Sequence, residues 1–519
     1  MNSGRRKLAR RRRRLIYNND GDDLLTMQPA KHGSAAEALL WERTTALLGS
    51  QVDSVWYYST NGMRLHHSDG PFGRLYGLPD PDGIATENYR RLVAEGKDAL
   101  EVMIDVCRQQ GIEVFYSNRM NDCHDSFNEP LRYYIRTQHP EWSLSTLDEG
   151  RKYAYPEIRS VWTAWNFEID EIRELTVDAL REVARTYDID GIELDFWRHL
   201  CYFPESMRHE PVSGEHLELF TEMVRQIRTA VDEEADKRGR PILLAGRCVE
   251  DEEISRNSGL DIKTWLSEGL VDMLSPAYGT EAIPPIESLV ELAHRYDTPV
   301  YPLAGPRPKI SAAAIGQEHW QKFEHYGNLP AWRGVARGLR AQGADGLQLF
   351  NFFNPTRPQW WELGEDESLE GKDTLYEWDF LPSQRRGYET FADLRNTRDR
   401  WPVEAGPQGC EPLPLFVGED LTQPLSGRAR STVLSVHVSG LTRAHELWLT
   451  VNGRRLSAWR PAALDFVRDK PADMWIEFQE GLEAFEKGRN DIRVYVRPSS
   501  ASVADKLKID RIQLEITCV

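Results

Sequence analysis

The sequence predicts an α/β protein: a (β/α)8 barrel followed by a C-terminal β-sandwich. Three observations support this fold class. Between residues 15 and 400, short apolar segments alternate with longer amphipathic ones, which is typical of parallel βα units. Beyond residue 408, short segments alternate apolar and polar residues, as antiparallel strands do. A stretch containing Pro and Gly, residues 402–414, separates the two regions.

Short apolar segments of the first region are expected to be the barrel strands. They are residues 15–18, 52–58, 112–117, 190–196, 241–246, 271–275, 299–303 and 346–352. Five or six βα units would suit a doubly wound sheet equally well, whereas eight favour a closed barrel. The number of strands therefore decides between the two architectures.

Longer amphipathic stretches separate these strands and are expected to be helices. They cover residues 35–48, 86–110, 167–187, 214–238, 261–269, 284–296, 329–342 and 384–395. In the fourth stretch, Leu217, Phe220, Val224, Ile227 and Val231 recur at helical spacing and define one apolar face. Each helix can therefore cover the outside of the barrel with one face.

The C-terminal region is expected to form a small accessory β-sandwich, residues 408–519, after a barrel domain of residues 15–400. Its predicted strands are residues 432–438, 445–451, 474–478, 491–496 and 509–516. Asn452-Gly453 follows the second of them, and this dipeptide is a strong signal for a two-residue hairpin turn.

Charge and composition exclude several classes of partner. The chain has 64 Lys and Arg against 82 Asp and Glu, a net charge of −18, which argues against nucleic acid. No apolar run approaches the roughly 20 residues that span a bilayer, so no membrane partner is expected. The six cysteines lack zinc-ligand spacing, and no phosphate-binding or dinucleotide motif occurs, so neither a metal nor a cofactor is expected. The oligomeric state stays unknown.

The N-terminus carries a basic run that includes Arg10 to Arg14. Neither an apolar stretch nor a small-residue cleavage site follows it, so it is not a recognisable signal peptide. We expect residues 1–14 to be a solvated basic tail and the protein to be cytoplasmic.

The segment Ile192-Glu193-Leu194-Asp195-Phe196 is the most informative of the chain. Side chains two apart in a strand share a face, so Glu193 and Asp195 project together. Two carboxylates on an otherwise apolar strand are costly to desolvate unless they are paired or used. A buried pair with an arginine is the structural alternative, and an enzymatic role places Asp195 at the rim where barrel enzymes keep their chemistry.

Other polar residues follow the predicted strands and are expected at the same rim. The candidate binding residues are Asn19, Asp20, Tyr57, Arg119, Asn121, Arg198, Arg247, Tyr278, Glu281 and Asn351. Hydrolysis of a glycosidic bond needs two carboxyl groups, one protonated and one ionised, with further groups that bind hydroxyls. This composition favours a carbohydrate substrate.

Four residues are the catalytic candidates. Asp195 is expected to be the nucleophile or base, and Glu193, one pleat deeper, is expected to tune it. Asp122 and His124 lie in a dense polar cluster after the third strand, and one of them is expected to be the proton donor or to bind a sugar hydroxyl. Glu250, Asp251 and Glu281 are rival acids. If Asp195 acts in hydrolysis, it must lie in an open, water-reachable hollow opposite a second proton-carrying group.

Two other functions fit the same residues. One is a non-catalytic carbohydrate-binding protein on a degenerate barrel. The other is a polysaccharide lyase, in which Tyr57, Tyr58 or Tyr278 acts with His124 in proton transfer without water. A divalent ion held by His124 and neighbouring carboxylates is a further alternative.

Four segments resemble the glycoside-hydrolase-like TIM-barrel superfamily, especially bacterial family 10-like glycosyl hydrolases. They are residues 117–122, 191–196, 259–272 and 349–352, and together they span about residues 112–354. The resemblance implies a barrel with a sugar-facing rim. The fourth strand is also similar to the chitinase signature Asp-Gly-x-Asp-x-Asp-x-Glu, but Trp197 stands where the acid belongs, which favours an aspartate nucleophile instead.

Overall fold

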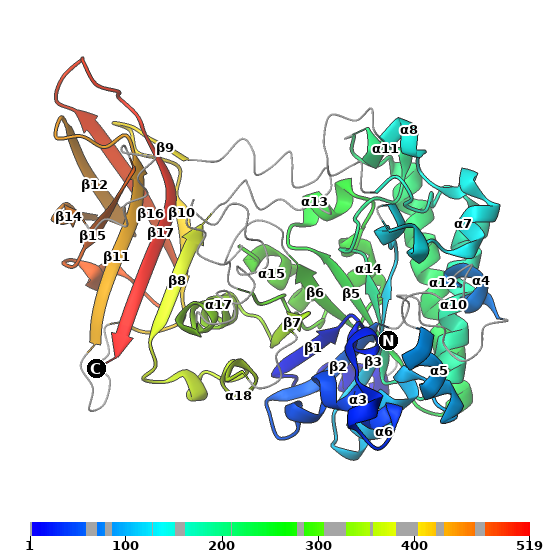
Figure 1. The fold of residues 1–519 in the computed structure, drawn as a ribbon. Coiled ribbons are helices and arrows are strands. Elements are labelled where there is room, and N and C mark those ends of the chain that lie inside the picture. The colour runs from blue at the N-terminus through cyan, green and yellow to red at the C-terminus, as the bar shows by residue number, and fades with distance from the viewer. Residues whose placement is uncertain are drawn as a thin grey trace.

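The computed structural model describes residues 3–58, 70–77, 86–126, 128–150, 161–208, 210–277, 285–305, 329–352, 357–379, 403–421, 430–461 and 473–518. Two kinds of sheet dominate it: one parallel sheet inside a ring of helices, and antiparallel sheets at the C-terminal end of the chain (Figure 1).

The parallel sheet confirms the barrel. Its strands are β1 (Leu15–Asn19), β2 (Val52–Tyr58), β3 (Glu113–Arg119), β4 (Gly191–Asp195), β5 (Leu243–Val249), β6 (Met273–Ala277) and β7 (Leu347–Phe350). They pair in the order β6-β5-β4-β3-β2-β1-β7. The register places Arg119, Asp195 and Arg247 side by side on three neighbouring strands.

The gap between β6 and β7 is filled by residues 299–303, the segment expected to be the seventh strand. It forms no regular strand, but Leu274 bridges to Val300 and Leu303 bridges to Gln348, both in parallel. The segment contains Pro299 and Pro302, which lack the N–H that a ladder needs, so pairing is reduced to single bridges.

Helices cover the outside of the barrel. The long ones are α3 (Ala35–Arg43), α5 (Thr86–Ala94), α6 (Ala99–Gln109), α10 (Asp170–Thr186), α12 (Gly214–Arg238), α14 (Ile262–Glu268), α15 (Glu287–Arg295) and α17 (Leu329–Ala341). Shorter ones are α2 (Asp23–Thr26), α4 (Pro71–Tyr76), α7 (Tyr134–Gln138), α8 (Leu147–Gly150), α11 (Pro204–Met207), α13 (Glu252–Asn257) and α18 (Gln359–Glu362). The helix expected over residues 384–395 lies outside the described residues.

The helix expected over residues 86–110 is two helices, α5 and α6. The break comes at Gly96, whose φ of +77° is easily adopted only by glycine. Asp98 then caps α6 through a capping box with Glu101, because each side chain accepts from the other residue's backbone N–H.

Strand alternation fills the barrel interior in layers. An apolar layer consists of Ala9, Ile16, Trp56, Phe115, Leu243, Ala245, Met273 and Tyr301. Gly191 begins β4 beside this layer because a Cβ there would lie 2.2 Å from the Phe115 ring. The next inward positions along these strands are polar, and they build the site described below.

The basic N-terminal segment is not a solvated tail, so that expectation is wrong. Residues Ser3–Ala9 form helix α1, and Arg13 is buried inside the barrel. Arg13 donates from Nε and Nη2 to the two carboxylate oxygens of Glu113, at 2.6 and 3.0 Å. Arg5 likewise reaches Asp272, with Nε 2.9 Å from Oδ1. Glu113 and Asp272 therefore draw Arg13 and Arg5 into the fold, whereas Arg10, Arg11 and Arg12 stay exposed. The composition of the segment alone could not show this.

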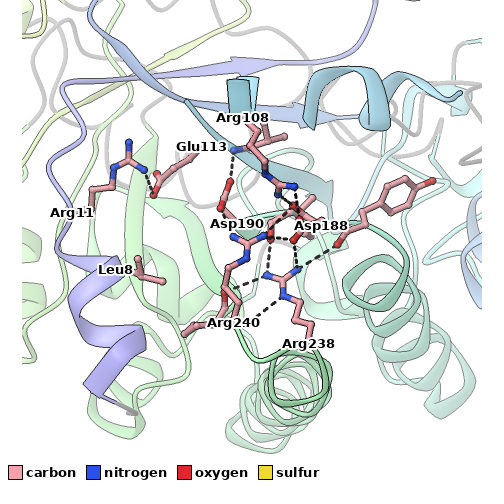
Figure 2. Close-up of polar contacts among 12 residues, drawn as sticks. Leu8, Arg11, Arg108, Glu113, Asp188, Asp190, Arg238 and Arg240 are labelled. Carbon is pink, nitrogen blue, oxygen red and sulfur yellow. Dashed lines mark hydrogen bonds and ion pairs between the residues drawn. The ribbon is translucent and has the colours of Figure 1, made fainter. Parts of the chain in front are cut away.

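The same end of the barrel carries a second arginine network (Figure 2). Asp188 pairs with Arg108 and Arg240, and Arg240 also donates to Asp190 at 2.6 Å. Arg238 donates to the Ile189 carbonyl at 2.7 Å. Burial lowers the pKa of Arg238 to about 10, with neighbouring Arg240 adding to the effect. These contacts tie the C-terminal end of α12 to the loop that enters β4.

The C-terminal region contains two antiparallel sheets, as expected of a β-sandwich. One sheet has the order β10-β16-β12-β13 and the other β14-β15-β11-β17-β8, with β9 paired to β17. The strands are β8 (Thr374–Asp379), β9 (Val403–Ala405), β10 (Leu413–Val417), β11 (Arg430–Ser439), β12 (His445–Val451), β13 (Arg454–Leu456), β14 (Trp459–Pro461), β15 (Asp473–Phe478), β16 (Gly488–Pro498) and β17 (Leu507–Cys518). The hairpin turn at Asn452-Gly453 is confirmed, because both residues have positive φ and β12 pairs with β13 around them.

The first strand of these sheets, β8, comes from within the range expected to be barrel. It pairs with β17 over Thr374–Asp379 and lies against helix α17. Gly334 of α17 permits this packing, because a Cβ there would lie 1.9 Å from the Leu375 carbonyl oxygen. The domain division at residues 15–400 and 408–519 stays a prediction, and β8 shows that chain from before residue 400 completes the second sheet.

Among the described residues, no helix has the length and apolar character that a membrane span requires.

Candidate functional site

Glu193 occupies a polar layer inside the barrel, directly beyond the apolar layer. It is fully buried and accepts hydrogen bonds from Asn18 Nδ2 at 2.6 Å, Ser117 Oγ at 2.5 Å and Gln348 Nε2 at 3.1 Å. Ser275 completes the layer by donating to Gln348 Oε1 at 2.7 Å. Side chains from β1, β3 and β7 therefore converge on the carboxyl group of Glu193 on β4, and Ser275 of β6 supports one of them, Gln348.

This environment makes Glu193 a proton-holding group near neutral pH. Burial raises its pKa to about 7; Arg247 opposes the rise, and the neighbouring carboxylate of Asp195 adds to it. A carboxyl group with this pKa can exist in either form at pH 7. Its three donors hold it in place below the rim, consistent with the expected supporting role.

Asp195 lies one pleat nearer the C-terminal end of β4. Its Oδ2 accepts from Arg247 Nη1 at 3.3 Å, and its Oδ1 accepts from the Arg198 backbone N–H at 3.0 Å. The residue is only 1 % exposed. Among the described residues, the open hollow expected around Asp195 is therefore not found, because the guanidinium of Arg247 and the turn after β4 enclose the carboxylate.

A second carboxylate cluster lies beside Asp195, at the ends of β1, β2 and β3. Asp122 Oδ2 accepts from Arg119 Nη1 at 2.9 Å and from the Tyr58 hydroxyl at 3.0 Å. The Arg119 guanidinium stacks over the Tyr58 ring at 4.0 Å, and its Nη2 lies 3.8 Å from Asp20 Oδ2. Arg119 therefore joins two of the predicted acidic residues.

His124 connects this cluster to the turn after β4. Its Nδ1 lies 2.6 Å from Asp122 Oδ1, and its Nε2 lies 2.9 Å from Arg198 Nη2. An arginine can only donate, so Nε2 accepts and the proton sits on Nδ1, facing the carboxylate. Burial opposes ionisation of Asp122, but His124 and Arg119 outweigh it and hold the pKa of Asp122 well below its usual range.

The Asp122–His124 pair is the most accessible proton-transfer group of the site, because the His124 side chain is 16 % exposed. His199 stands against it, with ring centroids 5.0 Å apart, in a backbone conformation with φ of +54°. Burial lowers the pKa of His199 well below its usual range, so this imidazole is neutral at pH 7.

Asp122, His124 and His199 could also be considered as metal ligands, since their ligand atoms lie within 4.8 Å of one another. Arg119 donates to Asp122 Oδ2 and Arg198 to His124 Nε2, so two guanidinium groups lie against the cluster. The charge around this cluster opposes cation binding.

Tyr57 and Asn19 do not face the site, so their expected roles in substrate binding are wrong. Both are buried on the helix-facing side of their strands, where they contact Asp23. The Tyr57 hydroxyl donates to Asp23 Oδ1 at 2.8 Å, and Asn19 Nδ2 donates to Asp23 Oδ2 at 2.8 Å. Burial raises the pKa of Asp23 to about 6. Alternation along a strand turns Tyr58 inward and Tyr57 outward, which separates these two neighbours.

Asn121 has a structural role instead of the expected one. Its amide donates to the Cys201 carbonyl at 2.6 Å and accepts from the Trp165 N–H at 3.0 Å, so it ties two loops together. Asn351 does lie at the rim, where its Nδ2 donates to Asp20 Oδ2 at 2.6 Å. The predicted residues Tyr278 and Glu281 lie outside the described residues.

Sequence reasoning missed four contributors to the site. Ser117 donates directly to Glu193, and Ser275 supports it through Gln348. Trp197 and Phe350 flank Arg247, whose guanidinium lies 4.9 and 4.1 Å from their ring centroids. Every second residue of β3, β6 and β7 faces the barrel interior, and this alternation could have identified Ser117, Ser275 and Phe350 from the sequence. Trp197 follows its strand and carries no such signal.

No protein-family model and no curated protein matches this chain. Solved structures show a distant likeness. An α-L-fucosidase isoenzyme 2 from Paenibacillus thiaminolyticus is 14% identical over 68% of this chain and 48% of its own, with a TM-score of 0.36. A cycloisomaltooligosaccharide glucanotransferase from Paenibacillus sp. is 8% identical over 97% of this chain and 57% of its own, with a TM-score of 0.34.

A glycoside hydrolase family 18 N-acetylglucosaminidase from Paenibacillus barengoltzii is 12% identical over 68% of this chain and 99% of its own, with a TM-score of 0.35. The chain thus spans only about half the length of the first two structures. Likeness this distant does not establish a substrate or a reaction.

Proposed function

We propose that this chain is a glycoside hydrolase whose reaction takes place at the C-terminal end of the barrel, with Asp195 as nucleophile or base. His124, once Arg198 releases Nε2 and that nitrogen is also protonated, gives the Nε2 proton to the leaving group and returns to the neutral imidazole, with its Nδ1–H held by Asp122. Glu193 beneath Asp195 adjusts the charge of the site. Asp20, Arg119 and Asn351 bind sugar hydroxyls at the rim.

One observation carries this proposal. Carboxylates from separate segments, Asp20, Asp122 and Asp195, gather at one end of a parallel barrel, where they pair with Arg119 and Arg247. Such a set is costly to desolvate, and barrel enzymes place their chemistry at this end. A reaction that separates charge along a glycosidic bond uses both an ionised carboxylate and a proton donor.

A non-catalytic carbohydrate-binding barrel is the second candidate, and the burial of Asp195 favours it. A nucleophile must reach an anomeric carbon, whereas Asp195 is 1 % exposed and bonded to Arg247 and the Arg198 amide. A carboxylate whose only task is to position Arg247 would look the same.

Asp195→Asn separates the two candidates. In a hydrolase it should reduce kcat on the best chromogenic glycoside by about 10⁴-fold while ligand binding persists. In a binding protein the wild type itself cleaves none of a panel of aryl glycosides and plant or algal oligosaccharides, although it binds one of them in calorimetry. Glu193→Gln serves as the companion variant, because it keeps the shape of the layer and removes only its charge.

Finer assignments belong to the same proposal. We place the chain near the family 10-like glycosyl hydrolases on the four motifs between residues 112 and 354, and we propose a cytoplasmic location. Fractionation of the native host tests the second point. The substrate class is an oligo- or polysaccharide.

A further inference from the structure

Arg247 is a buried arginine that uses only part of its hydrogen-bonding capacity. Its side chain is fully buried, and Nη1 donates to Asp195 at 3.3 Å. Within the described part of the chain, Nε and Nη2 make no hydrogen bond. Burying donors without acceptors is costly, so such a guanidinium is either compensated by other contacts or kept for an incoming group.

The two unused atoms define the shape of the missing acceptor. Nε and Nη2 lie on one edge of the planar guanidinium, and that edge donates two parallel hydrogen bonds. A carboxylate matches this edge in spacing and in charge. A sugar hydroxyl supplies only one oxygen there and no charge.

The position of Arg247 relative to the surface supports an incoming ligand. The two rings against its guanidinium, Phe350 and Trp197, are half-buried residues of the rim. The guanidinium therefore lies one side chain beneath the surface, next to flat rings that suit the faces of sugars.

Arg136 is an example of a buried arginine whose unbonded nitrogens are compensated by other contacts. Its Nε and Nη2 also make no hydrogen bond, but its guanidinium packs on Tyr133 and Trp165, at 5.0 and 4.1 Å from their ring centroids. Both of those rings are fully enclosed in the core. Nη1 of Arg136 also donates to the Asp122 carbonyl at 2.8 Å and to Asp125 Oδ1 at 2.9 Å. Arg136 thus has enclosed rings over its guanidinium, whereas the rings over Arg247 are partly exposed.

The neighbouring carboxylates of Asp195 and Glu193 do not bond the unused edge of Arg247. Asp195 takes Nη1, and Glu193 is held by its own three donors from Asn18, Ser117 and Gln348. Resting on the proposed function, we propose that the substrate carries a carboxylate, as a uronic acid residue does, and that Arg247 binds it through Nε and Nη2. The net charge of −18 opposes a long polyanion, so a single carboxylate at this position is the relevant group.

Binding of monosaccharides tests the proposal without any cleavage. We expect wild-type protein to bind D-glucuronate or D-galacturonate at least 10-fold more tightly than D-glucose or D-galactose, measured by calorimetry at equal ionic strength. Equal affinity for the acidic and neutral sugars overturns the proposal. Preference for galactose 6-sulfate over both uronates also overturns it, because a sulfate ester is then the preferred anion.

Variants locate the effect. Arg247→Lys retains a cation beside Asp195 but lacks the planar edge, so uronate affinity should fall about 10- to 100-fold. Arg238→Lys, at the opposite end of the barrel, is the control and should keep the uronate preference. If Arg247→Lys fails to fold, as judged by circular dichroism, the wild-type comparison above still decides the question.

Different results would overturn the uronate-binding proposal and the proposed hydrolase function. Uronate binding that depends on Arg247, with no glycoside cleaved, supports this inference and overturns the hydrolase. Cleavage of neutral glycosides without uronate preference supports the hydrolase and overturns this inference. Cleavage of aryl uronides in preference to matched neutral glycosides supports both.

Discussion

The two ends of the barrel each bury an arginine against a carboxylate, and the arginines differ in how fully they are bonded. At the N-terminal end, Arg13 donates twice to Glu113 and through Nη1 to the Ala9 carbonyl at 2.9 Å. At the C-terminal end, Arg247 bonds Asp195 through one nitrogen only. Both side chains are inaccessible, so burial does not distinguish them.

The difference lies in saturation of the hydrogen-bonding groups. Arg13 has partners on every nitrogen and joins the N-terminal segment to β3, which is what a structural ion pair does. Arg247 leaves a whole edge unbonded beside the rim, which costs stability and has a use only when a ligand is present. On the proposed function, the barrel separates its stabilising end from its functional end, as parallel barrels do.

The largest expected effect tests the N-terminal end. Arg13→Met leaves Glu113 buried without its partner, and we expect the free energy of unfolding to fall by about 3–5 kcal/mol in urea denaturation. Arg12→Met, one residue away, is the control. Arg12 pairs with Glu365 but is 71 % exposed, so its loss should cost no more than about 0.5 kcal/mol. Equal costs for the two variants would mean that Arg13 is not the anchor.

The stability of the protein should depend on pH through Glu193, which lies in the polar layer between the two ends of the barrel. The pKa of Glu193 is about 7 in the folded protein against an ordinary 4.5, so the folded state holds its proton more tightly than the unfolded state. Its contribution to stability is fully present below pH 4.5 and is lost as the pH rises through 7.

Glu193→Gln removes this contribution, so wild-type stability should decline relative to the variant by about 3 kcal/mol from pH 4.5 to pH 8. Urea denaturation at several pH values measures it. Glu483→Gln, at an exposed position of the second region, is the control. A pH-independent difference between wild type and Glu193→Gln would show that Glu193 is ionised throughout.

The rim of the C-terminal end should matter to catalysis. If His124 and Asp122 deliver the proton, His124→Gln should reduce kcat about 100-fold on a glycoside with a poor leaving group. With an activated aryl leaving group the loss should be smaller, because departure then needs little protonation. His294→Gln, at a half-exposed position on α15, is the matched control. Identical losses on both substrates would assign His124 a positioning role.

The smallest effect concerns the same polar layer. Ser275→Ala removes the donor to Gln348 Oε1 and leaves a buried acceptor unbonded, so we expect a loss of about 1–2 kcal/mol in stability. Ser267→Ala, at an exposed position of α14, should change stability by less than about 0.5 kcal/mol. A neutral Ser275→Ala would indicate that water replaces the hydroxyl there.

Much of the fold could be predicted because its signals are local. Residues 52–58 match β2, and residues 445–451 match β12. Alternation also placed Glu193 and Asp195 on one face, and both do face the barrel interior. The prolines at 299 and 302 were visible in the sequence, and they explain why that segment bridges its neighbours without forming a strand.

The site was less predictable because its contacts join distant segments. Asn18 and Glu193 are 175 residues apart, and Arg13 and Glu113 are 100 apart. Tyr57 and Tyr58 look equivalent in sequence, yet only Tyr58 reaches the rim cluster. The basic run at the N-terminus has the composition of a solvated tail, and only its acidic partners on other segments bring it inside.

The sequence by itself determined which segments become strands and helices, and that two carboxylates share a face of β4, because periodicity depends only on neighbouring residues. Only the tertiary structure decided which arginine meets which carboxylate, and which of them keeps donors unbonded. These pairings depend on how eight segments close around one interior. The distances between the charged groups there, and their burial, set the pKa values and the ligand preference.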